Sequence, residues 1–252
     1  MPTNSSDSRV SSPQRIASVV PLVPAWRVDR AFDYLPGEVA VEVGSLVRIP
    51  FGGRRVRGVV VAIEERVPER ELERVTALVT SLPVMPAGMQ RLFEWIAERY
   101  VTPRGRAYAR AVPPRVRVAV EPRPVRFVSR EQSILPTYEG GVELLAHLRV
   151  GGHGLHCIQV LPGTDRGALI AELLSAAQGP SLVAVPEVRY GSTVIDRLTN
   201  EIDGVVRLDS GIGDAERARG WLQFAAGSRA AVGGRSVVLA PSHVLRLIVV
   251  DE

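Results

Sequence analysis

The residues best suited to chemistry lie between positions 30 and 61, where aromatic and basic side chains are interspersed with turn residues. Arginine side chains suit phosphate, and aromatic rings offer faces on which nucleobases stack. The aromatic candidates are Phe32, Tyr34 and Phe51, and the candidate phosphate contacts are Arg48, Arg54, Arg55 and Arg57. Asp33 differs from these, because a carboxylate repels phosphate but accepts a hydrogen bond from a sugar hydroxyl. The pattern predicts a pocket for a nucleotide with a free hydroxyl.

Two short strands are expected to position this pocket. Residues 31–35 and 46–50 are rich in β-favouring side chains, and the turn signal Pro36-Gly37 lies between them, so we expect the two strands to pair. Gly52 and Gly53 then interrupt the sheet, and such glycines mark a bulge or a close approach of another backbone or a ligand. The alternative is that the aromatic residues form the core of a small barrel and Asp33 is a turn residue.

The composition narrows the class of protein. The chain has 252 residues, of which 46% are hydrophobic, enough for a sizeable core in one or two domains. It contains no run of about 18 apolar residues, which predicts that no helix spans a membrane. Residues 1–14 are polar and lack the apolar segment of a secretory signal, which predicts a disordered tail and a cytoplasmic, nucleoid-associated protein. The single cysteine, Cys157, excludes an internal disulfide and a multi-cysteine zinc site.

The positive charge belongs to the first half of the chain. Residues 1–120 contain 18 arginines and 12 acidic residues, a net +6, whereas residues 121–252 contain 13 and 15, a net −2, which together give the overall +4. This asymmetry favours nucleic-acid contact in the first half, although arginine also solubilises ordinary surfaces. All 31 basic residues are arginine, and the chain has no lysine.

The first half predicts an antiparallel β domain over residues 15–114, followed by a linker over 115–137. The expected strands are 16–23, 31–35, 46–50, 57–64 and 75–80, with an edge ribbon at 116–128 in the linker. Within residues 87–101, the apolar positions Met89, Leu92, Phe93, Ile96 and Tyr100 recur at helical spacing, which predicts an amphipathic helix packed on the sheet. Arg104, Arg106 and Arg110, interleaved with Tyr108, indicate either a second DNA-facing surface or a solvated helix face.

The second half, residues 138–252, predicts alternating helices and strands. Helices are expected at 142–148, 167–177, 192–198 and 214–226, and strands at 155–161, 181–185, 205–208, 229–232 and 245–250. Such alternation is typical of a parallel sheet covered by helices, so the predicted fold class is α/β after a small β-barrel-like domain.

Several motifs resemble the family of primosomal protein N′, the bacterial replication-restart helicases. F-D-Y-L-P at 32–36, V-E-V-G-S-L-V-R-I-P-F-G at 41–52, G-V-V-V at 58–61 and the segment 83–114 are similar to its DNA 3′-end-binding domain. V-P-E-V at 185–188, D-S-G-I-G-D-A-E-R at 209–217, V-G-G-R-S-V-V-L-A-P at 232–241 and L-I-V-V-D-E at 247–252 resemble its first RecA-like lobe.

The resemblance implies a set of site residues. The family holds a 3′-terminal nucleotide with residues that correspond to Phe32, Asp33, Tyr34 and Gly52. A family lysine has no counterpart in Leu72-Glu73-Arg74, where Arg74 is the candidate substitute. The winged-helix domain of the family is also missing, because the segment between Pro114 and Tyr138 is too short to form one.

The nucleotide-binding loop that is typical of the family is degenerate in this sequence. A P-loop needs glycines around the phosphates, a lysine that reaches the β- and γ-phosphates, and a Ser or Thr on Mg²⁺. The corresponding junction contains Gly163, Thr164, Asp165, Arg166 and Gly167. The lysine and the metal-binding hydroxyl are missing from this junction, and Asp165 is expected to cap a helix where phosphate would bind. We therefore interpret the loop as structural.

Asp251 and Glu252 occupy the place of the acidic, Mg²⁺-linked motif of the family, and the chain ends within it. The chain is expected to be either a fragment or a naturally short, C-terminally incomplete member. His153, His156 and Cys157 suggest a metal site, but we expect none, because adjacent residues of a strand point to opposite faces.

The sequence thus predicts a DNA-binding replication-restart protein that recognises 3′ ends at abandoned forks without helicase activity. The alternatives are an ATP-dependent 3′-to-5′ DNA helicase and a non-functional truncated fragment. The resemblance implies forked or single-stranded DNA, primosome or helicase-loading proteins and single-stranded DNA-binding protein as partners. It implies ATP, Mg²⁺ and two structural Zn²⁺ as family cofactors, and we expect none of them in this chain.

Overall fold

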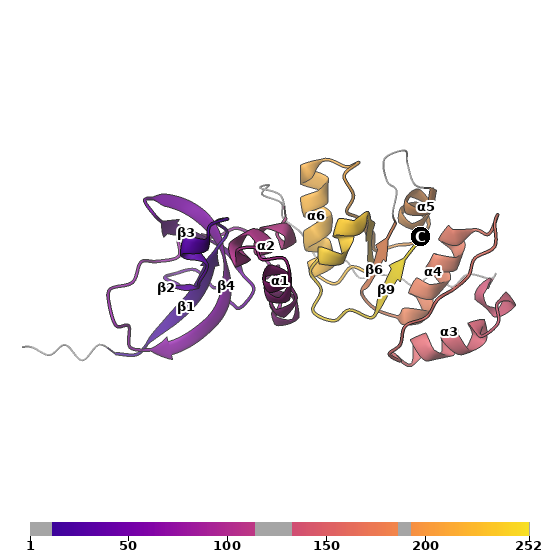
Figure 1. The fold of residues 1–252 in the computed structure, drawn as a ribbon, viewed down its shortest axis with the longest axis horizontal. Helices are drawn as coiled ribbons and strands as arrows, with labels where there is room; N and C mark the ends of the chain where they lie inside the picture. The colour runs from indigo at the N-terminus through magenta and orange to yellow at the C-terminus, as the bar shows by residue number, and fades with distance from the viewer. Residues whose placement is uncertain (1–11, 114–132, 186–192, 252) are drawn as a thin grey trace, which may run out of the picture. The chain divides into compact units, whose positions relative to one another are not determined.

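The computed structural model describes residues 12–113, 133–185 and 193–251. The chain divides into two compact units, Met1–Arg110 and Ala111–Glu252 (Figure 1). Each unit has its own sheet and its own hydrophobic clusters. The predicted ribbon at 116–128 and nearly all of the predicted tail lie outside the described residues. Among the described helices, none is long and apolar enough to cross a membrane.

Unit 1 is built on an antiparallel sheet. Its strands are β1 (Gln14–Pro21), β2 (Phe32–Tyr34), β3 (Leu46–Phe51), β4 (Arg54–Arg66) and β5 (Ala77–Leu78), in the order β2-β1-β4-β3-β5. The predicted pairing of residues 31–35 with 46–50 is wrong. β2 pairs with β1, and β3 lies between β4 and β5. Pairing with β1 places Phe32 opposite Val19 and Tyr34 opposite Ala17, so both aromatic side chains join the apolar face of the sheet.

Gly52 and Gly53 do not interrupt the sheet but form the turn between β3 and β4. Their φ angles are +57° and +72°, and the flanking residues Phe51 and Arg54 are paired directly. Two residues with positive φ match the right-handed twist of a two-residue hairpin, and glycine adopts this conformation at the lowest cost. The glycines therefore fix the register between β3 and β4.

The chain after β2 meets the chain before β5. The Leu35 N–H donates to the Glu73 carbonyl and the Val75 N–H donates to the Leu35 carbonyl, both at 2.9 Å, which makes a parallel bridge between Leu35 and Arg74. Residues 75–80, expected as a strand, contribute only the two residues of β5. The bridge joins the residue that follows β2 to a residue that precedes β5.

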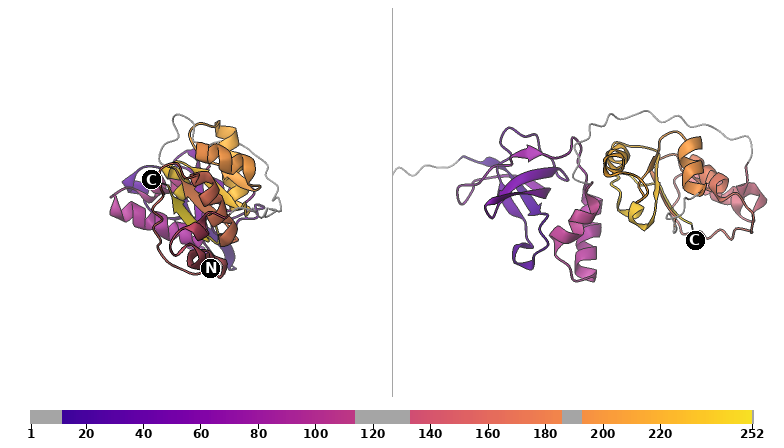
Figure 2. Two further views of the ribbon diagram at one scale, coloured as in Figure 1. Left: turned by 90° about the vertical axis from the view of Figure 1, so that its right-hand side faces the viewer. Right: turned by 90° about the horizontal axis from the view of Figure 1, so that it is seen from above.

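Two helices pack on the same side of unit 1, α1 (Ala87–Arg99) and α2 (Arg104–Ala111), as Figures 1 and 2 show. A short 3₁₀ helix, η1 (Trp26–Val28), precedes β2. The predicted apolar stripe of α1 is only partly correct, because Met89 and Phe93 are buried whereas Leu92 and Tyr100 are exposed. Tyr108 of α2 is fully buried against Phe93, so it cannot stack on DNA with the neighbouring arginines.

Unit 2 is built on a parallel sheet covered on both faces. The strands are β6 (Ser181–Ala184), β7 (Val205–Arg207), β8 (Ala230–Gly233) and β9 (Leu247–Val250), in the order β7-β8-β6-β9. The helices are α3 (Gly141–Arg149), α4 (Arg166–Ala177), α5 (Thr193–Glu201) and α6 (Asp214–Ala225), with the 3₁₀ helices η2 (Leu135–Thr137) and η3 (Arg235–Leu239). α4 and α5 pack on one face, and α6 and η3 pack on the other. This agrees with the predicted alternation of helices and strands.

One predicted strand of unit 2 does not form. Residues 155–161 have no regular structure, and the Leu155 side chain is 99% exposed. Ile158 and Val160 still pack partly against the cluster formed by α3 and α4. Alternating apolar residues therefore attach the segment to the helices rather than to the sheet.

Candidate nucleic-acid interface

Phe32 lies in a small cluster of aromatic and cationic groups. Its ring makes an edge-to-face contact with Phe51, with centroids 5.0 Å apart and planes at 75°. The Arg30 guanidinium carbon lies 4.9 Å from the centre of the Phe32 ring, close enough for a cation–π interaction. Phe32 is only partly buried, and Gly52, which follows Phe51, is exposed, so the structure brings these two predicted site residues to one region.

Tyr34 is a core residue rather than a stacking surface. Its ring is buried, and its hydroxyl donates a 2.9 Å hydrogen bond to the Pro50 carbonyl. Burial, reinforced by the nearby negative charge of Glu73, raises the pKa of Tyr34 to about 12. The burial of Tyr34 fits the alternative offered by the sequence, in which this residue belongs to the core, and its hydrogen bond ties β2 to β3.

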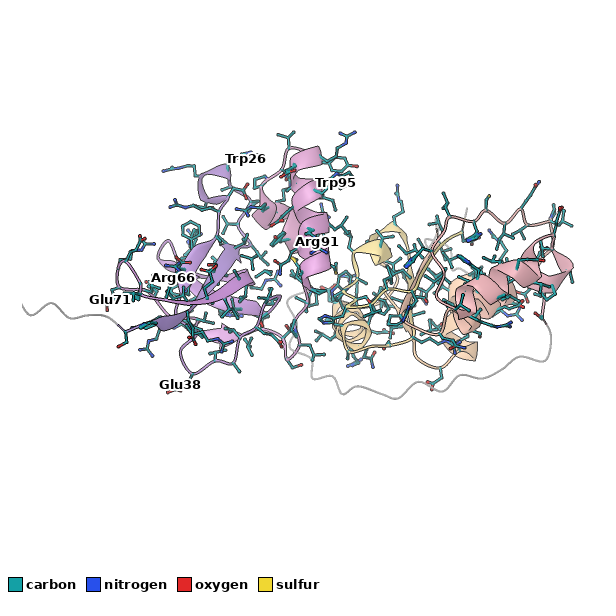
Figure 3. The ribbon with its side chains drawn as sticks, turned by 90° about the horizontal axis from the view of Figure 1, so that it is seen from below. Trp26, Glu38, Arg66, Glu71, Arg91 and Trp95 are labelled. Carbon is teal, nitrogen blue, oxygen red and sulfur yellow. The ribbon has the colours of Figure 1, made fainter. Side chains whose placement is uncertain are left out.

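Asp33 lies on the opposite face of β2 from Phe32 and Tyr34, because side chains alternate along a strand. One carboxylate oxygen accepts a 2.9 Å hydrogen bond from the Ser18 hydroxyl, and the other accepts a 2.6 Å hydrogen bond from Arg66. This bond raises the pKa of Arg66. Asp33 is therefore a strand residue and not a turn residue, and its side chain leaves β2 on the face opposite to Phe32 and Tyr34. Figure 3 shows Arg66 at the sheet of unit 1.

The backbone of β2 is open on one side. β2 is the first strand of the sheet order and pairs only with β1 among the named strands. The Leu35 N–H and carbonyl point away from β1, toward residues 73–75. Bond direction repeats at every second residue, so the Asp33 N–H and carbonyl also point to this open edge. An edge strand can add hydrogen bonds to a ligand that lies alongside it.

The predicted phosphate contacts divide between the two faces of the hairpin formed by β3 and β4. Arg48 is paired with Arg57 and Pro50 with Arg55, so the side chains of Arg48, Arg55 and Arg57 share the face opposite the core. Arg54 pairs with Phe51 on the other face. Arg48 and Arg57 lie directly opposite each other, and like charges in such a pair repel.

Arg74, the predicted substitute for the family lysine, lies beside the residue that follows β2. It is exposed, it forms the bridge to Leu35, and its side chain lies close to the backbone of Gly37. Arg104, in contrast, is engaged inside unit 1, where its backbone N–H donates to the Asp29 carboxylate at 2.8 Å and its guanidinium forms an ion pair with the same group.

Other protein groups contact residues 163–167, which were predicted to form a degenerate nucleotide loop. Asp165 caps α4, as predicted, by accepting a 3.0 Å hydrogen bond from the Ala168 N–H, and its second oxygen pairs with Arg197. Thr164 lies 3.4 Å from the Tyr138 hydroxyl. Gly163 has open space around it, whereas a side chain at Gly167 would collide with Arg197. The first turn of α4 thus presents a carboxylate where a phosphate would need free N–H groups.

Arg166 and Asp251 connect the loop to the acidic motif. The Arg166 guanidinium and the Asp251 carboxylate lie 2.9 Å apart, and the Asp251 side chain is only 9% exposed. The Asp251 backbone N–H donates to the Ala184 carbonyl, which extends the pairing of β9 with β6. Glu252 lies outside the described residues. The acidic motif is therefore paired with an arginine of the loop itself.

Sequence reasoning missed Ser18, Arg30 and Arg66. Arg66 is 33 positions from Asp33 along the chain, and only the pairing of β1 with both β2 and β4 brings the two together. The register of that pairing includes a shift between Ser18 and Val19, which no local pattern in the sequence indicates.

Comparison with known proteins identifies relatives of this chain. Residues 18–113 match the family model for the "3'DNA-binding domain (3'BD)" of PriA. The chain is 31% identical over 244 residues to a probable replication restart protein PriA from Mycobacterium leprae (strain TN), with 88% of the chain and 37% of the relative covered. It is 33% identical over 240 residues to the protein of that name from Mycobacterium tuberculosis (strain ATCC 25618 / H37Rv), covering 88% of the chain and 36% of the relative.

The antiparallel sheet and the family model together define unit 1 as a 3′ DNA-binding domain. The chain belongs to the family of the replication restart protein PriA, which confirms the resemblance inferred from its motifs. It spans a little over a third of the length of the curated relatives it matches.

Proposed function

We propose that this chain binds the 3′ end of a DNA strand at a replication fork through unit 1, and that unit 2 does not hydrolyse ATP or unwind DNA. We further propose that unit 2 is a degenerate RecA-like lobe and that the protein acts at the nucleoid, in the cytoplasm. Its partners would be forked or single-stranded DNA, helicase-loading proteins and single-stranded DNA-binding protein.

The observation that carries the end-binding proposal is the position of Asp33 on an open strand edge. Its backbone N–H and carbonyl point outward from this strand edge, where they can form hydrogen bonds with the polar groups of a terminal base. Its carboxylate is 32% exposed and accepts hydrogen bonds from Ser18 and Arg66. A carboxylate has about four acceptor positions, so it can still accept a hydrogen bond from a 3′-hydroxyl.

Arg66 adds a positive charge next to the Asp33 carboxylate. The guanidinium beside Asp33 partly neutralises the carboxylate, so the phosphodiester next to the terminal sugar is not repelled. Arg74 lies beside the same strand on the side of Leu35 and supplies a further cation. Phe32 and Arg30 flank the other face of β2. The site therefore combines a hydroxyl acceptor with cations that suit the adjacent phosphates.

The filled loop of unit 2 supports the proposal that ATP is not hydrolysed. A bound nucleotide would have to displace the Asp165 cap from α4 and break the Arg166–Asp251 ion pair. Having displaced them, it would find no lysine, because the chain contains none. Arginine presents a planar, branched head and does not reproduce the compact charge of a P-loop lysine.

The end-binding proposal is tested by fluorescence titration with forked DNA that carries either a 3′-hydroxyl or a 3′-phosphate on the leading-strand end. We expect the terminal phosphate to weaken binding by about tenfold, because it replaces a hydrogen-bond donor with an anion next to Asp33. Equal affinity for the two ends would remove the argument for recognition of the terminus.

The proposal for unit 2 is tested by phosphate release in the presence of ATP, Mg²⁺ and forked DNA, with strand separation measured in parallel. We expect no DNA-stimulated turnover. A rate on the order of 1 s⁻¹, within the ordinary range of enzymes, would instead establish the chain as an ATP-dependent motor.

A further inference from the structure

Two histidines of unit 2 meet at a place that the proposed DNA site does not use. The rings of His147, in α3, and His156 make an edge-to-face contact, with centroids 5.3 Å apart and planes at 64°. The expectation that no metal binds near His156 and Cys157 assumed a strand at 155–161. That strand does not form, so the argument from alternating faces no longer applies.

Both Nε2 atoms border the same small volume beside Gly154. A Cβ built on Gly154 would lie 2.9 Å from Nε2 of His156 and 3.7 Å from Nε2 of His147. The two nitrogens are therefore at most 6.6 Å apart, the sum of these two distances. Glycine at position 154 leaves the volume between them open.

The Nε2 atom of His147 is an unsatisfied polar atom. It is buried, and it has no hydrogen-bond partner among the residues that the structure describes. Buried polar atoms in native proteins nearly always have a partner, so one without a partner needs an explanation. A bound ion supplies that explanation, because a metal occupies the lone pair that is otherwise left unused.

We propose that His147 and His156 bind a borderline divalent metal ion such as Zn²⁺ through their Nε2 atoms, with water in the remaining positions. Imidazole suits zinc, copper and nickel, and nitrogen–zinc distances are about 2.0–2.1 Å. The two nitrogens would then lie about 3–4 Å apart, and the proposal requires the exposed His156 side chain to adopt this separation. No group of three or more His, Cys, Asp or Glu side chains surrounds a metal position within the described ranges, so two protein ligands define the site.

The test is calorimetric titration of the full chain with ZnCl₂ alone and, separately, with NiSO₄ alone. All proteins carry Cys157→Ser, which removes the only thiol. We expect one ion per chain, and His147→Gln or His156→Gln should weaken binding by about tenfold or more, since even outer-shell changes have effects of that size.

Gly154→Ala is the sharpest variant, because it keeps both histidines and fills the volume between them. Gly154 does not have a positive φ, and the first atom its Cβ meets is the far end of the mobile His156 side chain, so the fold should persist. His243→Gln, at another exposed histidine of unit 2, is the matched control and should bind metal as the parent does.

Loss of binding in the three site variants, with the control unchanged, supports the proposal. No binding at millimolar metal, or undiminished binding in His156→Gln and Gly154→Ala, overturns it. Thermal unfolding is measured for each variant, and if Gly154→Ala unfolds, the exposed His156→Gln variant decides the outcome.

Discussion

Each unit contains an aspartate–arginine ion pair, but the two carboxylates differ in how far solvent reaches them. In unit 1, Asp33 and Arg66 are 32% and 37% exposed, and Asp33 lies on β2, the first strand of the sheet. In unit 2, Asp251 is only 9% exposed, and Arg166 closes over it from the first turn of α4. The same pair of residue types thus leaves a carboxylate partly exposed in one unit and largely buried in the other.

This difference follows from what each sheet leaves open. β2 is short and pairs on one side only, so a carboxylate on it keeps access to solvent. Asp251 continues β9, which is paired with β6. Its cation, Arg166, comes from the start of α4, the helix that precedes β6. We therefore expect ligand binding to respond to changes in unit 1 and stability to respond to changes in unit 2.

The largest expected effect is on DNA affinity. Arg48→Glu combined with Arg55→Glu reverses two exposed charges on one face of the β3–β4 hairpin and should weaken forked-DNA binding by about 10–100-fold at low salt. The salt dependence should become shallower, because fewer counterions are released. The control is Arg235→Glu combined with Arg246→Glu, which changes the net charge equally in unit 2. Equal loss in both double variants would mean that binding follows net charge and not unit 1.

The next effect concerns the terminal hydroxyl. Asp33→Asn should reduce the preference for a 3′-hydroxyl over a 3′-phosphate by about tenfold, because the amide carries no charge. Arg66→Gln should increase the preference, because it leaves the Asp33 charge uncompensated. Opposite changes in the two variants, measured by titration with both DNA ends, distinguish a positioned carboxylate from a general electrostatic effect. Glu38→Gln, on the exposed turn after β2, is the matched control and should change neither affinity.

A smaller effect is expected on the stability of unit 2. Arg166→Ala leaves the largely buried Asp251 without its cation and should lower the free energy of unfolding by about 1–2 kcal/mol, a value reduced because Arg166 is nearly half exposed. Asp251→Asn should cost less, because it removes the charge and keeps the shape. Denaturant unfolding of both variants and of the double variant gives the coupling energy. A coupling of zero would show that the pair contributes nothing, and DNA affinity should remain unchanged throughout.

The elements with the strongest local sequence signals were predicted correctly, whereas contacts between residues far apart in the sequence were missed. Helical spacing located α1, and βα alternation predicted the parallel sheet, because both depend on residues close in sequence. The sheet order of unit 1 was missed, since the Pro36-Gly37 turn does not show that β2 returns to β1. Asp165 was predicted as a cap from its place before a helix. The Arg66 and Asp251 contacts were beyond reach, because long-range register decides them.

The smallest expected effect is on how the stability of unit 1 depends on pH, and Tyr34 should produce it. Its folded-state pKa is raised from the ordinary value of 10.0 to about 12 by burial and by Glu73. A raised pKa means that the neutral phenol is favoured by folding, so the stabilisation is fully present below pH 10 and is lost as the pH rises toward 12.

Tyr34→Phe removes both the hydrogen bond to the Pro50 carbonyl and this titration. At neutral pH the variant should be less stable by about 1 kcal/mol, the usual net value of one hydrogen bond. The difference between the two proteins should then shrink as the pH rises above 10, because only the parent must keep a phenol protonated in the fold. Tyr100→Phe, at an exposed tyrosine of the same unit, is the control and should follow the parent. Urea unfolding monitored at several pH values measures all three proteins. A difference that stays constant across this range would place the Tyr34 hydroxyl in water and not in the core of the sheet.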